Sequence, residues 1–304
     1  MKITKKNWFL LALANLVAVG TAWGAGDLPS NFSSEGTIAN TRHNLSQRSA
    51  DGAYTGTTMD PYRNNYNAQV CVYCHTPHGA NQLGGTGNAP LWNRTARTTT
   101  YTLYNQQTLS NTITQPGPNS LTCLSCHDGQ TAVDSIVNMP GSDGYKADLR
   151  LNPTTTQTST LLNAWQNPAG TTDASAHMRL ADGSCLSCHN PDNTELGAGA
   201  TDFTAYAIGT DLRNDHPVGI KFPSGDDWNS TFVEKGKIKF RDLDSDNRPD
   251  KNEVRLYDTG EGFEVECASC HDPHGVPGTT SKFLPTFLRV TADGSEICLT
   301  CHTK

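Results

Sequence analysis

The sequence has few of the residues that build a large side-chain core. Only 35% of its 304 residues are hydrophobic and 8% are aromatic, whereas it contains 27 glycines and 16 prolines. Such a composition disfavours long helices, long strands and an extensive apolar interior. We therefore expect a mostly irregular chain with short helices and a few short strands, in which bound groups supply much of the core.

Basic residues are also scarce. The chain has 23 lysines and arginines against 30 aspartates and glutamates. Three of the basic residues lie within the first 24 residues, so residues 25–304 carry 20 basic and 30 acidic side chains, a formal charge of −10. Nucleic acids and anionic membrane surfaces attract basic faces, so neither is an expected partner.

The N-terminal apolar run is too short to cross a bilayer, because Trp8–Val19 contains only twelve residues. Three lysines precede it in MKITKK, and small residues follow it in GTAWGAG. These features predict a secretory signal peptide at residues 1–24, with Ala22 and Gly24 before the cleavage point. No cysteine stands near that point, which argues against a lipoprotein. Residues 25–304 are expected to form a single exported domain with no membrane span.

No cysteine lies outside five copies of the pentapeptide C-x-x-C-H. The copies are CVYCH (71–75), CLSCH (123–127), CLSCH (185–189), CASCH (267–271) and CLTCH (298–302). The pattern is typical of covalently attached haem c, whose vinyl groups bond the two thiols while the adjacent imidazole ligates the iron. Zinc sites made of four thiolates use such pairs two at a time, and five pairs leave one over. Neither zinc nor a thioredoxin-like centre explains the histidine.

The motifs therefore predict five haems c, whose stack is expected to serve as the core. The attachment residues are Cys71, Cys74, Cys123, Cys126, Cys185, Cys188, Cys267, Cys270, Cys298 and Cys301. The proximal iron ligands are His75, His127, His189, His271 and His302.

Five histidines lie outside the motifs, and five irons each need a sixth ligand. These histidines are His43, His78, His177, His216 and His274. The equality in number predicts bis-histidine ligation throughout. Methionine is the competing ligand, and the predicted mature chain offers Met59, Met139 and Met178, of which Met178 is the plausible substitute beside His177. Bis-imidazole ligation lacks the rise in redox potential that Met/His ligation gives, and a filled coordination sphere favours electron transfer over catalysis.

Two motifs continue as C-H-x-P-H-G, which places His78 three residues after His75 and His274 three residues after His271. Residues three apart in a helical turn project from one face, so the two cannot ligate one iron from opposite sides. His78 and His274 are therefore expected to serve neighbouring haems. Because the last two motifs are the closest in sequence, the simplest assignment gives His274 to the last haem. The same logic assigns His78 to the second haem.

The segment DLDSDNRPDKNE has acidic residues at five positions of a calcium-loop pattern. They are Asp242, Asp244, Asp246, Asp250 and Glu253. Asn247 stands where an EF-hand loop has glycine, and the flanking segments KIKF and EVRLY alternate like strands. The segment is a candidate calcium loop, and the alternative is a solvated acidic hairpin turn.

The stretches CVYCHTPHG, PLWNR, CLSCHDG, DHPVG and CASCHDPHG resemble multihaem cytochromes of the doubled C-x-x-C-H type. Over residues 42–304 the chain looks most similar to the outer-surface cytochromes of metal-reducing bacteria that polymerise into extracellular filaments, or nanowires. This resemblance implies alternating parallel and T-shaped haem pairs, little secondary structure, and conduction along a homopolymer. It also implies that a histidine near the mature N-terminus, here His43, ligates a haem of the adjacent subunit.

Three functions remain open for such a chain. The first is an electron conduit in a secreted filament at the cell surface, which passes electrons to other redox proteins or extracellular acceptors. The second is a monomeric, soluble periplasmic electron carrier in which His43 folds back on its own haem. The third is a redox enzyme such as a pentahaem nitrite reductase. That family's catalytic haem uses C-x-x-C-K, whereas all five motifs here end in histidine. We therefore expect an electron-transfer protein and no enzyme.

Overall fold

The computed structural model describes residues 38, 41–43, 70–81, 91–94, 99–106, 109, 111, 113–130, 145–146, 156–157, 179–181, 185–192, 202–223, 228–229, 231–278 and 283–303. The predicted signal peptide, His177 and the three candidate methionine ligands lie outside the described residues. Within the described part of the chain, no helix is long and apolar enough to cross a membrane.

The described helices are short, and those at the C-x-x-C-H motifs follow the sequence prediction. Their bounds are η4 Val70–Tyr73, α1 Pro118–His127, α3 Cys185–Cys188, α4 Cys267–Cys270 and α5 Glu296–Leu299. α1 begins with a proline, whose missing N–H costs no hydrogen bond in the first turn of a helix. α4 begins with reciprocal hydrogen bonds between Glu266 and Ser269, which form a capping box. Three further 3₁₀ turns are η6 Thr204–Tyr206, η7 Pro285–Phe287 and η8 Asp293–Ser295.

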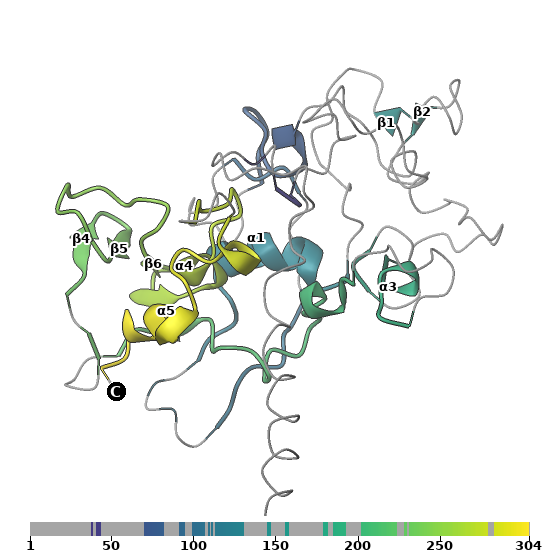
Figure 1. The fold of residues 1–304 in the computed structure, drawn as a ribbon. Coiled ribbons are helices and arrows are strands. Elements are labelled where there is room, and N and C mark those ends of the chain that lie inside the picture. The colour runs from purple at the N-terminus through teal and green to yellow at the C-terminus, as the bar shows by residue number, and fades with distance from the viewer. Residues whose placement is uncertain are drawn as a thin grey trace, which may run out of the picture.

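A five-stranded antiparallel sheet lies beside the helices (Figure 1). Its strands run in the order β3-β7-β6-β5-β4, with bounds β3 Ile220–Lys221, β4 Val233–Lys235, β5 Ile238–Phe240, β6 Arg255–Asp258 and β7 Phe263–Val265. Phe240 pairs with Arg255, so the acidic segment is the loop of a β5–β6 hairpin. This confirms the strand pattern read from its flanks. A separate pair joins β1 Tyr145–Lys146 to β2 Thr156–Gln157.

Apolar side chains of the described residues are buried in small, separate groups. Tyr101, Leu124 and Leu212 form one cluster, and Trp92 packs against Cys74 in another. Many of the buried residues are polar or charged. The prediction of a mostly irregular fold with a small side-chain core is confirmed.

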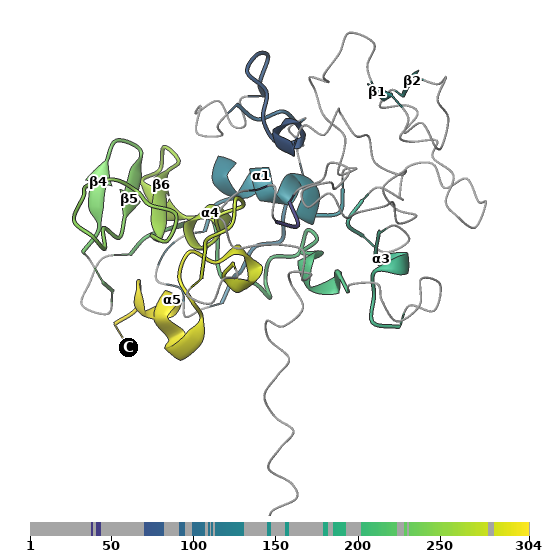
Figure 2. The same cartoon turned by 45° about the horizontal axis from the view of Figure 1, so that its top comes forward.

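α1 and α4 lie side by side at the centre of the molecule in both views (Figures 1 and 2). The five-stranded sheet lies on one side of this pair, and α3 lies on the other. α4 follows directly from the sheet, because β7 ends at Val265 and the helix begins at Cys267. The fold thus brings together the second and fourth motifs, which are far apart in the sequence.

Gly275 follows the C-H-x-P-H segment of the fourth motif in a conformation that favours glycine. Its φ is +84°, and an added Cβ would lie 2.6 Å from the Phe283 ring and 3.0 Å from Thr41 Cγ2. We expect Gly275→Ala to destabilise the holoprotein by about 2–5 kcal/mol, because a left-handed backbone costs roughly 1–2 kcal/mol and overpacking roughly 1–3 kcal/mol.

Gly294→Ala is the matched control for Gly275→Ala. Gly294 has a φ of +61°, and its added Cβ would meet no atom within 4 Å. This variant should lose only the backbone contribution, about 1–2 kcal/mol. Denaturant unfolding followed by circular dichroism measures both variants, and equal losses would contradict the close packing around Gly275.

Candidate haem sites

Each C-x-x-C-H motif adopts similar local geometry. The N–H of the motif histidine donates to the carbonyl of the first cysteine over 2.8–3.1 Å in the motifs that end at His75, His189, His271 and His302. In the second motif the same pentapeptide forms the last turns of α1. This single turn keeps the two thiols and the imidazole close together, as attachment to one porphyrin requires. None of the nine cysteines whose side chains are described forms a disulfide, so no disulfide prevents them from bonding haem.

At least five of the described histidines have one ring nitrogen occupied by a hydrogen bond. The Nδ1 atom of each lies 2.7–3.0 Å from an acceptor oxygen. The acceptor is the Asp272 carboxylate for His274 and a backbone carbonyl for the others. The five are His43, His127, His216, His271 and His274. Nδ1 must therefore carry the hydrogen, which leaves a lone pair on Nε2. Metal-ligating histidines usually have this arrangement, because the outer hydrogen bond sets the tautomer and the ring orientation.

His75 and His274 lie at a separation that suits one iron. Their ring centroids are 6.2 Å apart, and their planes differ by 17°. An imidazole nitrogen binds a transition metal at about 2 Å, so two imidazoles on opposite sides of one metal have centroids roughly 6 Å apart. The proximal histidine of the first motif and a predicted distal histidine therefore form a candidate axial pair.

A buried ion pair orients His274. The Asp272 carboxylate accepts from His274 Nδ1 at 3.0 Å and from Arg289 Nη1 at 3.1 Å. Burial acts to raise the pKa of Asp272, but the hydrogen bond from His274 and the charge of Arg289 outweigh it and lower that pKa to about 2. Arg289 is itself held, since its Nε donates to the Ala268 carbonyl at 3.0 Å and its Nη1 to the Lys251 carbonyl at 2.9 Å.

Sequence reasoning missed both members of this ion pair. Asp272 could have been suspected from its place between His271 and His274, because carboxylates often hydrogen-bond metal-ligating histidines. Arg289 stands outside every motif, and nothing in the local sequence marks it.

His43 and His127 form a second pair with the same separation. Their ring centroids are 6.2 Å apart, and their planes differ by 76°. His43 Nδ1 donates to the Pro273 carbonyl at 2.9 Å, and its ring stacks on Phe287 at 4.2 Å. Burial, and then the charge of His127, lowers the pKa of His43 to about 4, so the imidazole is neutral at pH 7, as a metal ligand must be. His43 thus lies beside a haem motif of its own chain.

His216 lies near the last motif. Burial, and then the charge of His216, lowers the pKa of His302. The Trp228 ring lies 4.4 Å from the His302 ring. The assignment of His216 to the last haem as its sixth ligand stays a prediction. His78 is exposed, and the haem that it serves stays a prediction, as does the role of His177.

The C-H-x-P-H segment of the fourth motif differs in conformation from the sequence prediction. His271 has φ −112° and ψ 141°, which is extended backbone. The predicted helical turn is therefore wrong here, since the helix ends before His271. Pro273 acts in the same direction, because it disfavours helical backbone in Asp272, the residue before it. His274 also lies beside His75 of the first motif, whereas the sequence assigned it to the last haem.

Trp92 provides an independent test of whether the first motif suits a haem. Its side chain is buried, its ring lies edge-on to His75 at 6.2 Å, and its Nε1 has no hydrogen-bond partner among the described residues. A buried N–H without a partner is rare in proteins. A haem propionate is an acceptor that would satisfy it, so the site fits haem c. When bound, the haem supplies a redox-active iron, whose potential depends on the protein's ligands, hydrogen bonds and burial.

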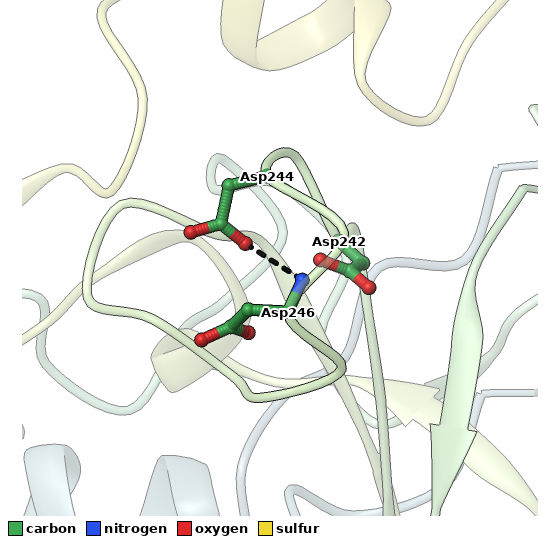
Figure 3. A group of neighbouring side chains, drawn as sticks. All are labelled: Asp242, Asp244 and Asp246. Atoms are coloured by element: carbon green, nitrogen blue, oxygen red, sulfur yellow. Dashed lines mark hydrogen bonds between the residues drawn. The ribbon is translucent and has the colours of Figure 1, made fainter.

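The acidic hairpin loop brings together three of the five predicted calcium ligands (Figure 3). One carboxylate oxygen from each of Asp242, Asp244 and Asp246 lies within 4.8 Å of the others. The same carboxylates also shape the loop: Asp244 Oδ1 accepts the N–H of Asp246 at 3.1 Å, and Asp242 Oδ1 accepts that of Ser245 at 2.8 Å.

Glu253 and Asp250 do not join this group. Glu253 is buried, and its two carboxylate oxygens accept the N–H groups of Leu243 at 2.7 Å and Asp250 at 2.8 Å. The residue expected to complete the calcium loop therefore closes the hairpin instead. Sequence spacing alone could not distinguish these two uses of a carboxylate.

Comparison with known proteins covers the C-terminal part of the chain. Residues 261–304, which contain the fourth and fifth motifs, match the family described as the doubled CXXCH motif. A comparison with curated proteins finds no match. The family match, together with the two imidazole pairs, supports a c-type cytochrome with doubled haem-binding motifs.

Proposed function

We propose that the protein transfers electrons through five haems c, each ligated by two histidines. The observation that carries this proposal is the separation of two imidazole pairs, His75 with His274 and His127 with His43, which is 6.2 Å in both. An iron between two imidazoles has no open position for a substrate, which favours electron transfer over catalysis. Its ligands stay in place while it gains and loses an electron.

Haem content and spin state test this proposal on the unmodified holoprotein. We expect mass spectrometry to find five haems per chain, one for each motif. We expect electron paramagnetic resonance of the oxidised protein to show low-spin iron throughout, because two imidazoles give a strong ligand field. A high-spin signal from any haem of the unmodified protein, or fewer than five attached haems, contradicts the proposal.

We further propose that the protein works outside the cytoplasm, as the subunit of an extracellular filament that passes electrons to other redox proteins or extracellular acceptors. Attachment of haem c outside the cytoplasm supports export, and the predicted signal peptide agrees. The resemblance to filament-forming outer-surface cytochromes supports the polymer. The resemblance would assign His43 of one subunit to a haem of its neighbour, but His43 lies beside His127 of its own chain, so the polymer that we propose does not depend on that ligand.

A monomeric periplasmic carrier is the second candidate, and one observation favours it. His43 contacts Pro273 and lies beside His127 of its own chain, so a single chain could complete this haem by itself. Negative-stain microscopy and sizing of the protein released by cells separate the two candidates. Helical filaments support the polymer, whereas particles of one chain only would overturn it.

Calcium binding at the hairpin loop is a separate proposal, supported by the three gathered carboxylates. Because Glu253 is engaged elsewhere, we expect a dissociation constant no tighter than about 10⁻⁴–10⁻³ M, as in weak extracellular sites. Calorimetry with calcium on the chelator-treated holoprotein measures it, with Asp244→Asn as the test and Glu261→Gln, outside the loop, as the control. If addition of calcium to the unmodified protein produces no binding heat, the loop is a solvated acidic turn and not a calcium site.

A further inference from the structure

The acceptor of the His274 ring hydrogen carries a charge, whereas the acceptors of four other histidines are neutral. Those four donate from Nδ1 to backbone carbonyls, and they are His43, His127, His216 and His271. His274 donates to the Asp272 carboxylate. We infer that Asp272 and Arg289 set the reduction potential of the first haem, attached at Cys71 and Cys74. Asp272 lowers that potential through His274, and Arg289 limits the effect.

A short turn fixes the carboxylate against the imidazole. Asp272 Oδ1 accepts the backbone N–H of His274 at 3.0 Å and its ring Nδ1–H also at 3.0 Å. The His274 ring lies 6.2 Å from the ring of His75 and nearly parallel to it. The inference rests on the proposed haem attachment and on this pair of imidazoles. The carboxylate then acts on the first iron through a single ligand.

Arg289 holds a positive charge next to the same carboxylate. Its Nη1 donates to Asp272 Oδ2 at 3.1 Å, and the side chains of Arg289 and Asp272 are only 3% and 7% exposed. The carbonyls of Ala268 and Lys251 keep the guanidinium in place. Buried charges are screened much less than exposed ones. Arg289 therefore reduces the strength with which Asp272 attracts the His274 hydrogen.

A charged acceptor changes how strongly an imidazole binds iron. A carboxylate that accepts the outer N–H raises the basicity of the ligating nitrogen. A more basic ligand stabilises Fe(III) more than Fe(II), so the reduction potential falls. One electron enters the iron, no bond forms or breaks, and the hydrogen stays on Nδ1. Arg289 weakens the carboxylate as an acceptor and adds a nearby positive charge, and both effects raise the potential.

The opposite signs of these effects distinguish tuning from orientation alone. If Asp272 and Arg289 only kept the His274 ring in place, loss of either side chain would loosen the same ligand. The potential would then shift in the same direction in both variants. If the two side chains act by charge, loss of Asp272 raises the potential and loss of Arg289 lowers it.

Asp128 provides a matched control, because it follows the histidine of the second motif as Asp272 follows that of the fourth. Asp128 is also buried. It accepts from the Tyr101 hydroxyl at 3.0 Å and from the Gln130 N–H at 2.9 Å, whereas His127 donates from Nδ1 to a backbone carbonyl. Loss of the Asp128 charge should therefore leave the potential of the first haem unchanged.

Redox titration of the holoprotein, followed by electron paramagnetic resonance, tests the inference. The signal of the first haem is the one missing from a Cys71→Ala/Cys74→Ala protein. We expect Asp272→Asn, which keeps the shape and loses the charge, to make reduction of this haem about tenfold more favourable, a rise of about 59 mV for one electron. Arg289→Gln should make reduction less favourable, and Asp128→Asn should not change it. The first iron should stay low-spin in all three variants.

Two results would overturn the inference. One is an unchanged first-haem potential in Asp272→Asn, or an equal shift in Asp128→Asn. The other is a shift in the same direction in Asp272→Asn and Arg289→Gln.

The Arg289→Gln variant decides alone if Asp272→Asn loses its sixth ligand and becomes high-spin. Its His274 acceptor is intact, so a lowered potential supports the inference and an unchanged or raised potential contradicts it. All of these results are compatible with five low-spin haems in the unmodified protein. The proposed function could therefore survive the failure of this inference.

Discussion

His274→Ala is expected to turn the haem at Cys71 and Cys74 from low-spin to high-spin while the last haem stays low-spin. His274 lies at the separation from His75 that one iron between two imidazoles requires. Its removal leaves that iron with five ligands and an open position. We expect one of the five haems to change, so carbon monoxide bound by the reduced protein should rise from none to one per chain. Electron paramagnetic resonance and carbon monoxide titration measure the change, and added imidazole should reverse it.

A background that lacks the first haem identifies which iron has opened. In a Cys71→Ala/Cys74→Ala protein, His274→Ala should create no high-spin haem, because the iron it serves is absent. If a high-spin signal still arises there, His274 ligates another haem. His216→Ala is the matched control, since it should open the haem at Cys298 and Cys301 in both backgrounds.

His43→Ala is expected to open the second haem, and to do so at every protein concentration. The His43 ring lies 6.2 Å from that of His127, and it is held by the Pro273 carbonyl and by stacking on Phe287. A ligand supplied by the same chain does not depend on assembly. The unmodified protein should therefore remain low-spin from micromolar to nanomolar concentration, whereas the variant should bind one carbon monoxide per chain throughout.

Dilution distinguishes ligation within a chain from ligation between subunits. If His43 came from a neighbouring subunit, dilution would separate the subunits and the unmodified protein would gain one high-spin haem. Sizing at the same concentrations shows whether that change accompanies loss of polymer. If the His43→Ala variant keeps all five haems low-spin, His43 is not an axial ligand of any haem.

Local chemistry could be predicted from the sequence because it depends on residues that are neighbours in the chain. C-x-x-C-H places two thiols and an imidazole within one turn, so the attachment residues and the short helices α1, α3, α4 and α5 follow from spacing alone. The alternation in KIKF and EVRLY likewise predicts the β5–β6 hairpin. The scarcity of apolar residues correctly predicts a small side-chain core among the described residues.

The pairing of histidines that we propose as axial ligands could not be predicted in the same way, because it joins residues that are far apart in the chain. His274 was assigned to the last haem since that motif is nearest in sequence, yet its ring lies beside His75, almost two hundred residues earlier. The helical turn on which the sequence argument relied is absent, because His271 is extended and Pro273 disfavours helical backbone in Asp272. Arg289, which holds Asp272 and so orients His274, belongs to no motif.

The hairpin loop shows the same limit on a smaller scale. Five acidic residues match the spacing of a calcium loop, but only Asp242, Asp244 and Asp246 gather. Glu253 is turned inward by two backbone N–H groups that need an acceptor. A carboxylate can ligate an ion or satisfy buried donors, and only the folded backbone selects between these uses.

The sequence by itself indicated haem c as the cofactor and fixed the number of C-x-x-C-H motifs and of histidines, because each motif consists of five consecutive residues. The tertiary structure decided which imidazoles face each other, which carboxylate orients them and which motifs are neighbours. These are long-range choices, set by the packing of α4 on α1, by the turn at Pro273 and by the buried pair of Asp272 and Arg289. An iron needs ligands on both of its faces, and in the ligation that we propose the second ligand comes from residues that only folding brings near.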